Sequence, residues 1–177
     1  WNYRMTELEG AVGIVQFKKL KRLTDHRVRL ASYLADKLKR FPGLKLPKTR
    51  PQCDHVCFVY AIRFDALQAG ISRDLFIKAL SAEGIPFGAG YVRPIYMEPI
   101  YQKRKIFTNS GFPFDLQTKH NRDNYKKGSC PNVEHLHEQT LILTGLCRYP
   151  LTKRDMDDVV CAFEKVYTAI PELKKTH

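Results

Sequence analysis

The sequence predicts an α/β (α+β) fold in which one long helix precedes a small, largely antiparallel sheet that carries helices on one face. Two observations lead to this prediction. Apolar residues recur at helical spacing from Leu8 to Leu38, and lysine and arginine fill many of the positions between them. After this segment, short β-branched and aromatic runs alternate with shorter helical patterns. A chain of 177 residues is long enough to bury one core and to carry an additional arm.

The long helix has a recognisable beginning and end. Thr6 and Glu9 form the Ser/Thr-x-x-Glu pattern of a capping box, so we expect the helix to begin directly after Thr6. Phe41-Pro42-Gly43 ends the pattern. Because the pattern is long for a helix of a globular domain, we expect a bend or break near residues 23–25.

A helix of this length is typical of a link between two parts of a larger molecule. We therefore divide the chain into an inter-domain motif with the linking helix at 1–41 and a small C-terminal α/β domain at 42–177. In the second part, clusters of β-branched, aromatic or apolar residues predict strands at 55–64, 85–91 and 140–144.

Capping residues and breakers predict the remaining helices. Ser72 is expected to cap a helix that ends at Gly84, and Pro131 is expected to open a short helix. Thr152 is expected to cap a last helix that ends at Pro171. Irregular sequence predicts loops at 47–51 and at 101–128.

The charge of the chain is strongly positive. Lysine and arginine outnumber aspartate and glutamate by 30 to 18, which gives a formal net charge of +12. The basic residues form several short clusters rather than one block, so we interpret them as solvated helix faces and do not expect a nucleic-acid partner. A basic module that binds nucleic acid or another anionic partner, and an interaction protein that dimerises through the long helix, are the alternatives.

The cysteines and apolar runs limit the possible environment. Five cysteines without the dense spacing of a disulfide scaffold indicate reduced thiols. Cys53 and Cys57 flank His55, but no second closely spaced pair of zinc type follows, so we expect no metal site. The apolar runs are too short to span a bilayer. We therefore expect a soluble cytoplasmic protein that does not bind membranes.

The residues alone contain no complete catalytic constellation. Gly88-Ala89-Gly90 follows an expected strand but opens no helix of the kind that binds phosphate. Ser72 beside Arg73 is explained as a helix cap. Taken this way, the sequence predicts a soluble α/β module and no particular chemistry.

The first residues, however, resemble a known motif. The segment 2–20 is similar to the pattern NYRM-S/T-E-L-x-A-A-x-G-x-x-Q-L-x-K-L of the DegT/StrS family of sugar aminotransferases. Further segments resemble this family in the same order along the chain, at 72–86, 90–101, 130–134 and 152–166. The resemblance covers nearly the whole chain. It is closest to members that act on inososes and other cyclic keto-sugars.

The resemblance implies a pyridoxal-phosphate-dependent enzyme of fold type I, of which this chain would be the C-terminal segment with the small domain. Such enzymes are homodimers that transfer an amino group from glutamate or glutamine to a keto-sugar, often nucleotide-linked, or to a keto-cyclitol. The cofactor supplies the electron sink, and the protein supplies orientation and electrostatics. The Schiff-base lysine of the family belongs to the large domain. We therefore assign no catalytic residue and expect this segment alone, whether fragment, split gene product or degenerate homologue, to be inactive.

The same resemblance suggests roles for two residues at the beginning of the chain. It implies that Asn2 and Arg4 bind the cofactor phosphate in the active site of the neighbouring subunit. A guanidinium can hold a phosphate with two hydrogen bonds, and an amide donates without adding charge. The alternative, from the residues alone, is that Asn2 is a turn residue and Arg4 is a solvated cation at the start of the helix.

Three more residues are candidates for substrate binding: Tyr91, Arg93 and Tyr96. They belong to the segment that resembles the substrate-side turn of the family. Members often carry histidine at or near the position of Tyr96, so this sequence departs from the pattern there. Arg93 would bind the carboxylate of the donor or a sugar phosphate, and a surface arginine on a bend is the alternative.

Overall fold

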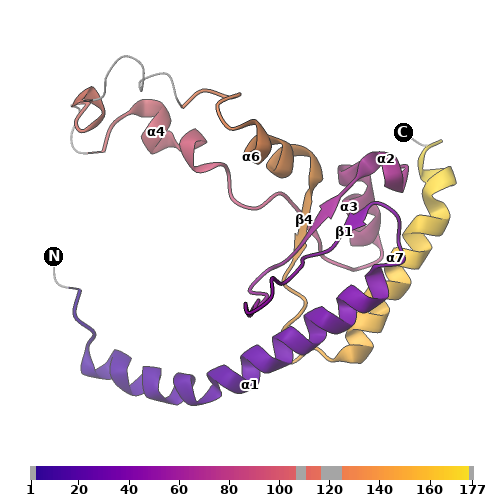
Figure 1. Cartoon of the computed structure of the whole chain (residues 1–177), viewed down its shortest axis with the longest axis horizontal. Coiled ribbons are helices and arrows are strands. Elements are labelled where there is room, and N and C mark those ends of the chain that lie inside the picture. The colour runs from indigo at the N-terminus through magenta and orange to yellow at the C-terminus, as the bar shows by residue number, and fades with distance from the viewer. Residues whose placement is uncertain (1–2, 107–110, 117–124, 176–177) are drawn as a thin grey trace.

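The computed structural model describes residues 3–106, 111–116 and 125–175. Its centre is a four-stranded antiparallel sheet with the strand order β1-β2-β4-β3 (Figure 1). The strands are β1 (Leu44–Lys45), β2 (Tyr60–Phe64), β3 (Gly88–Ala89) and β4 (Leu141–Thr144). The predicted small antiparallel sheet is therefore confirmed.

The two central strands, β2 and β4, supply the core side of the sheet because every second residue is buried. In β2 these residues are Tyr60, Ile62 and Phe64. Ile62 lies opposite Ile142 of β4 in the antiparallel register. Ala61 and Arg63 alternate with the buried residues and face the other side of the sheet, where they line an open cavity.

Helices cover the core side: the C-terminal half of α1 (Glu7–Leu38), α3 (Arg73–Ala82) and α7 (Lys153–Leu173) (Figure 1). Phe76 of α3 is fully buried, and its ring centroid lies 4.8 Å from that of Phe64 and 5.4 Å from that of Phe163. Leu34 and Leu38 of α1 belong to the same core. The prediction that the helices lie on one face of the sheet is confirmed.

The helix boundaries follow local capping chemistry. The predicted starts after Thr6, Ser72 and Thr152 are confirmed. At the first of these, the N–H of Thr6 donates to the carboxylate of Glu9 at 2.8 Å, and the N–H of Glu9 donates to the hydroxyl of Thr6 at 3.3 Å. Gly84, with a φ of +81°, ends α3 as predicted.

Between β3 and β4, residues 91–106, 111–116 and 125–140 form an arm that projects away from the sheet (Figure 1). The arm contains η1 (Ile95–Met97), α4 (Pro99–Lys103), η2 (Phe114–Leu116), α6 (Pro131–His135) and the π-helix η3 (Leu136–Thr140). The helix expected from Pro131 is confirmed as α6. The loop expected at 101–128 contains short helical turns, and its residues 107–110 and 117–124 lie outside the described part.

Two expected strands are shorter than predicted. The strand expected at 55–64 begins only at Tyr60, because Cys57 has a φ of +49° and its N–H donates to Nδ1 of His55 at 2.9 Å. This local turn keeps residues 55–59 out of β2. The strand expected at 85–91 is reduced to Gly88–Ala89, and the φ of +64° at Gly90 turns the chain away from the sheet.

Two expectations about helices were also wrong. Of the bend or break expected near residues 23–25, the break is absent: α1 is one continuous helix that curves along its length (Figure 1), with neither proline nor glycine between residues 14 and 41. An ion pair of 2.6 Å between Lys21 and Asp25 supports this region. The last helix continues through Pro171 to Leu173, because a proline in the last turn disturbs few backbone hydrogen bonds.

The N-terminal half of α1 extends beyond the sheet (Figure 1). Leu8 and Phe17 on this half are 77% and 76% exposed. Charged residues interrupt the apolar ones, and none of the helices in the described ranges is both long and apolar enough to cross a membrane. The expected division of the chain at residues 41 and 42 remains a prediction.

Candidate functional site

Two of the three substrate candidates, Arg93 and Tyr96, line one cavity at the base of the arm. The cavity has a volume of about 500 Å³, and its other walls are aliphatic and aromatic: Val92, Pro94, Ile95, Tyr101, Tyr125 and Val133. Among the described residues that line the cavity, Arg93 is the cation. A single guanidinium in an otherwise apolar and phenolic wall can orient an anionic group of a ligand.

The hydroxyl of Tyr96 is engaged by another residue of the arm. It donates a hydrogen bond to the carboxylate of Glu134, which also accepts the N–H of Gly128 at 2.7 Å. Desolvation and this hydrogen bond raise the pKa of Tyr96 to about 12, and the Tyr96 hydroxyl is the main cause that lowers the pKa of Glu134. Tyr96 therefore contributes its ring to the cavity wall, while its hydroxyl holds the arm together.

An aromatic cluster stabilises the outer part of the arm. The ring centroids of Tyr101 and Tyr125 are 5.3 Å apart, and that of Phe114 lies 6.2 Å from Tyr101. The side-chain amide of Gln102 donates to the carbonyl oxygens of Tyr96 and Tyr125, both at 2.7 Å. The walls of the Arg93 cavity are thus joined to one another within the arm, apart from the main core.

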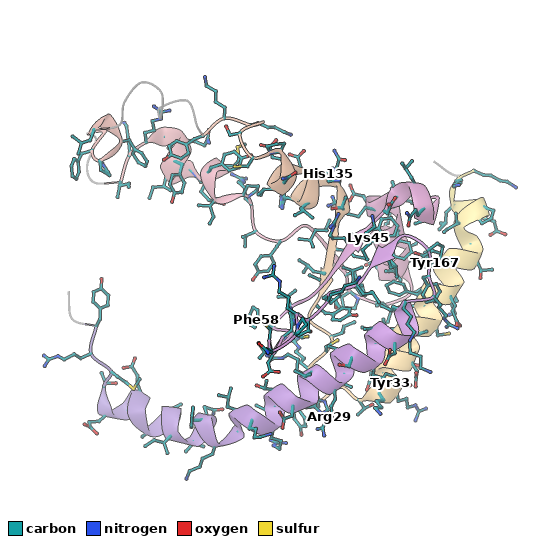
Figure 2. The ribbon with its side chains drawn as sticks, in the orientation of Figure 1. Arg29, Tyr33, Lys45, Phe58, His135 and Tyr167 are labelled. Atoms are coloured by element: carbon teal, nitrogen blue, oxygen red, sulfur yellow. The ribbon has the colours of Figure 1, made fainter. Side chains whose placement is uncertain are left out.

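The third candidate, Tyr91, lines a different cavity. This cavity, also of about 500 Å³, lies against the side of the sheet that faces away from the core and is bordered by residues 54–59 and by Leu141 and Leu143. Tyr91 is 59% exposed. Phe58, two residues before β2, borders this cavity (Figure 2). The structure therefore places Arg93 and Tyr96 together and Tyr91 in a neighbouring cavity.

The turn at Gly90 positions the start of the arm against its end. The N–H of Gly90 donates to the carbonyl oxygen of Leu141 at 2.8 Å. A Cβ at Gly90 would lie 2.8 Å from the carbonyl oxygen of His137, so this close approach requires glycine. The buried Arg73 donates from Nη1 to the same oxygen of His137 at 2.7 Å. Arg73, Gly90 and η3 thereby fix where the residues after Gly90 leave the sheet.

Of the two candidates for binding the cofactor phosphate, only Arg4 belongs to the described residues. Asn2 is outside the described residues. Arg4 is exposed and precedes the first turn of α1. It does not line the cavity of Arg93 and Tyr96. The role of both residues stays a prediction.

His55 and Cys57 contact each other within a local turn of the backbone. Nδ1 of His55 lies 3.0 Å from Sγ of Cys57, and burial raises the pKa of Cys57. Within residues 3–106, 111–116 and 125–175, the structure shows no group of three or more histidine, cysteine, aspartate or glutamate side chains that could hold a metal ion.

The sequence analysis did not predict that three further residues shape the site: Arg73, Tyr125 and Glu134. Glu134 could have been noticed as an acidic residue in the first turn of a helix opened by proline. Tyr125 could have been noticed as an aromatic residue within a basic polar stretch. For Arg73 the sequence contains no comparable signal, because its partner His137 lies 64 positions away.

The architecture defines a class of protein. A small antiparallel sheet with helices on one face, preceded by a long helix, is found in fold type I aminotransferases. The structure is similar to that of DesV from S. venezuelae in complex with a ketimine intermediate, with a TM-score of 0.67 and 23% identity. This likeness covers 93% of the present chain and 37% of DesV. It shows a shared fold.

The sequence assigns the chain more narrowly. It matches the model of the DegT/DnrJ/EryC1/StrS aminotransferase family over residues 1–164, and the chain belongs to this family. The resemblance stated from the motifs is thereby confirmed. Members of this family generally depend on pyridoxal phosphate.

Two curated relatives show how much of a longer protein the chain represents. It is 27% identical to MJ1066 of Methanocaldococcus jannaschii over 167 residues. It is 25% identical to SpsC of Bacillus subtilis, a spore coat polysaccharide biosynthesis protein, also over 167 residues. Each match covers 94% of this chain and 38% of the relative. The chain thus spans little more than a third of the length of these relatives.

Proposed function

We propose that the chain is the small-domain portion of a pyridoxal-phosphate-dependent aminotransferase that aminates a keto-sugar, nucleotide-linked or free, or a keto-cyclitol. The observation that carries the proposal is the family match over residues 1–164, a range that includes the whole Arg93 cavity. The role of SpsC in polysaccharide biosynthesis supports a sugar as the amino acceptor. Glutamate or glutamine is the proposed donor, and the cytoplasm is the proposed location.

The geometry supports distinct roles for the candidate residues. Arg93 binds an anionic group, either the carboxylate of the donor or a phosphate of the sugar substrate. The ring of Tyr96, held by Glu134, forms the wall beside it, and Tyr91 reaches the substrate from the neighbouring cavity. Arg4, together with Asn2, contacts the cofactor phosphate of a neighbouring subunit in a homodimer.

Pyridoxal phosphate, when bound, supplies the electron sink of the reaction. The residues of this chain bind and orient, and the lysine that anchors the cofactor belongs to the large domain in the family. We therefore propose that the chain by itself does not transaminate. Residues 1–41 would connect it to that large domain.

The first experiment mixes the purified chain with pyridoxal phosphate and records absorption at about 410–430 nm, where the bound cofactor absorbs. We expect no stoichiometric band. A stoichiometric band that disappears on reduction with borohydride would show a Schiff-base lysine in this chain and would contradict the proposed inactivity.

The second experiment uses a chimera in which residues 1–164 replace the matched segment of SpsC. We expect this chimera to bind the cofactor and to transfer an amino group from glutamate to a keto-sugar. Arg93→Met in the chimera should raise the KM for the anionic reactant about tenfold or more with a smaller change in kcat. A chimera that folds and binds the cofactor but aminates no keto-sugar would contradict the proposed substrate class.

A further inference from the structure

Two adjacent cavities lie at the opposite edge of the sheet from β3, where β1 pairs with β2. Their volumes are about 870 Å³ and about 310 Å³, and Lys45 and Arg63 line both of them. Neither cavity contains a residue assigned above to substrate or cofactor. Figure 2 shows Lys45 of β1 and His135 of α6, which borders the smaller cavity, at the end of the sheet where the arm joins β4.

The two cations shared by these cavities face each other across the strands. Lys45 and Arg63 are Cα partners in the antiparallel register, so their Cβ atoms are about 4.5–5.5 Å apart. Like charges directly opposite each other destabilise a sheet. Nζ of Lys45 is 3.4 Å from the carboxylate of Asp65, whereas the guanidinium of Arg63 has no ion pair or hydrogen bond with any described residue. Of these two cations, Arg63 is therefore the one without an acidic partner among the described residues.

The larger cavity combines this charge with an apolar floor. Its cationic rim includes Lys48, which has no ion pair in the described ranges, and Lys39, which is paired with Asp36 at 3.2 Å. The remaining walls are aliphatic: Ala35, Leu44, Leu46, Pro47, Ala61 and Leu141. The two carboxylates nearby, Asp36 and Asp65, are each engaged by a lysine. The net charge of the rim therefore stays positive beside an apolar surface.

The smaller cavity contains a buried hydroxyl without a partner. Oγ1 of Thr140, the last residue of η3, is buried, and it forms no hydrogen bond with the described residues. Thr140 lines this cavity together with Lys45 and Arg63. A buried hydroxyl without a hydrogen bond is unfavourable, and a phosphoryl oxygen accepts hydrogen bonds from hydroxyl groups. An anion at Lys45 and Arg63 would therefore also satisfy Thr140.

We propose that these cavities bind an organic phosphate. Its phosphoryl group lies between Lys45 and Arg63 and accepts a hydrogen bond from Thr140, and its organic part covers the aliphatic floor formed by Leu44, Leu46 and Pro47. A doubly negative group removes the repulsion between the two cations and forms charge-assisted hydrogen bonds with both. The volume of the larger cavity is in the range that accommodates a ligand with one or two rings.

The experiment titrates the isotope-labelled chain with adenosine monophosphate, inorganic phosphate and adenosine, and follows the backbone amides by NMR. We expect adenosine monophosphate to shift the amides of Lys45, Arg63 and Thr140, and inorganic phosphate to shift the same amides with lower affinity. Adenosine should bind at least about tenfold more weakly than its monophosphate because it lacks the charge-assisted bonds. Binding of adenosine equal to that of the monophosphate would overturn the proposal, as would the absence of shifts with both phosphates.

Variants separate this site from general electrostatic attraction. Lys45→Met and Arg63→Met should each lower the affinity for adenosine monophosphate about tenfold or more. The control is Lys165→Met, which removes the same charge from α7, where Lys165 pairs with Glu83 at 2.8 Å. It should leave the affinity unchanged, and an equal loss in this control would show non-specific attraction and contradict a built site.

A second measurement guards against misfolding of the variants. Lys45 and Arg63 are exposed and repel each other, so Arg63→Met should unfold at a temperature no lower than the unliganded wild type. Adenosine monophosphate should raise the melting temperature of the wild type but not that of Arg63→Met. Thr140→Val should weaken binding several-fold, and Thr140→Ser should retain it. Equal stabilisation of wild type and Arg63→Met by the nucleotide would refute the assignment.

Discussion

Tyr96 and Glu134 lie 38 positions apart, and the hydroxyl of one donates a hydrogen bond to the carboxylate of the other. The carboxylate also accepts the N–H groups of Gly128 at 2.7 Å and of Cys130 at 3.4 Å. One side chain thus joins the residues that follow β3 to the residues that precede α6. Because Tyr96 also lines the Arg93 cavity, this contact determines the shape of the proposed substrate site.

Glu134→Ala removes all three of these hydrogen bonds and should loosen the arm without unfolding the core. We expect trypsin to cleave after Lys126 and Lys127 several-fold faster in the variant, because local opening exposes these bonds. The thermal transition of the core should change little. Glu138→Ala is the matched control, because within the described ranges Glu138 pairs only with the side chain of Lys127, at 2.7 Å, and exposed pairs contribute little. Equal cleavage rates in both variants would contradict the assigned role.

The phenol of Tyr96 should ionise near pH 12 rather than near its ordinary value of 10. Desolvation and then the hydrogen bond to Glu134 favour the neutral form. Since the folded-state pKa is raised, the stability that this proton provides is fully present below the ordinary pKa and is lost as the pH rises from about 10 to about 12. The phenolate absorbance of wild type minus Tyr96→Phe measures this ionisation. In Glu134→Gln the transition should move toward lower pH.

The sequence was sufficient for elements that depend on neighbouring residues. The capping boxes at Thr6 and Thr152 and the terminator at Gly84 involve contacts over a few positions, and their predictions are confirmed. The start of β2 was misplaced because apolar character continues upstream of Tyr60, while the hydrogen bond between His55 and Cys57 turns the backbone. A hydrophobic pattern does not report such a bond.

The candidate site was predicted only in part, because its shape depends on contacts between residues far apart in the sequence. The segment with Tyr91, Arg93 and Tyr96 was located by resemblance, and the structure then divided it between two cavities. That division depends on the turn at Gly90 and on its contact with His137, 47 residues later in the chain. Contacts over such separations are set by tertiary packing, which local propensity does not encode.

Arg73→Met should destabilise the fold by about 1–3 kcal/mol, because it leaves the carbonyl oxygen of His137 without its buried donor. Arg73 is only 8% exposed, so water does not readily replace the guanidinium. Arg73→Lys should recover part of the loss, since an ammonium can donate to one carbonyl but lacks the planar fork. Urea denaturation measures both values. Lys78→Met, at an exposed position of the same helix, should change the stability by less than about 0.5 kcal/mol.

Comparing the stabilities of Gly90→Ala and Gly84→Ala distinguishes the cost of backbone strain from the cost of a steric clash. Both glycines have positive φ, +64° at Gly90 and +81° at Gly84, so alanine should cost about 1–2 kcal/mol at either position. A Cβ at Gly84 meets no described atom within 4 Å, whereas one at Gly90 would lie 2.6 Å from Nδ1 and 2.8 Å from the carbonyl oxygen of His137.

The side chain of His137 can rotate away from this Cβ, but its carbonyl oxygen accepts the hydrogen bond from Arg73 and cannot move without breaking it. We therefore expect Gly90→Ala to be less stable than Gly84→Ala by a further 1–3 kcal/mol or so in urea denaturation. The amides of Tyr91 and Arg93 should shift in the NMR spectrum of Gly90→Ala alone. If both variants lose equal stability and those amides stay in place, the contact between the Gly90 turn and η3 does not position the arm.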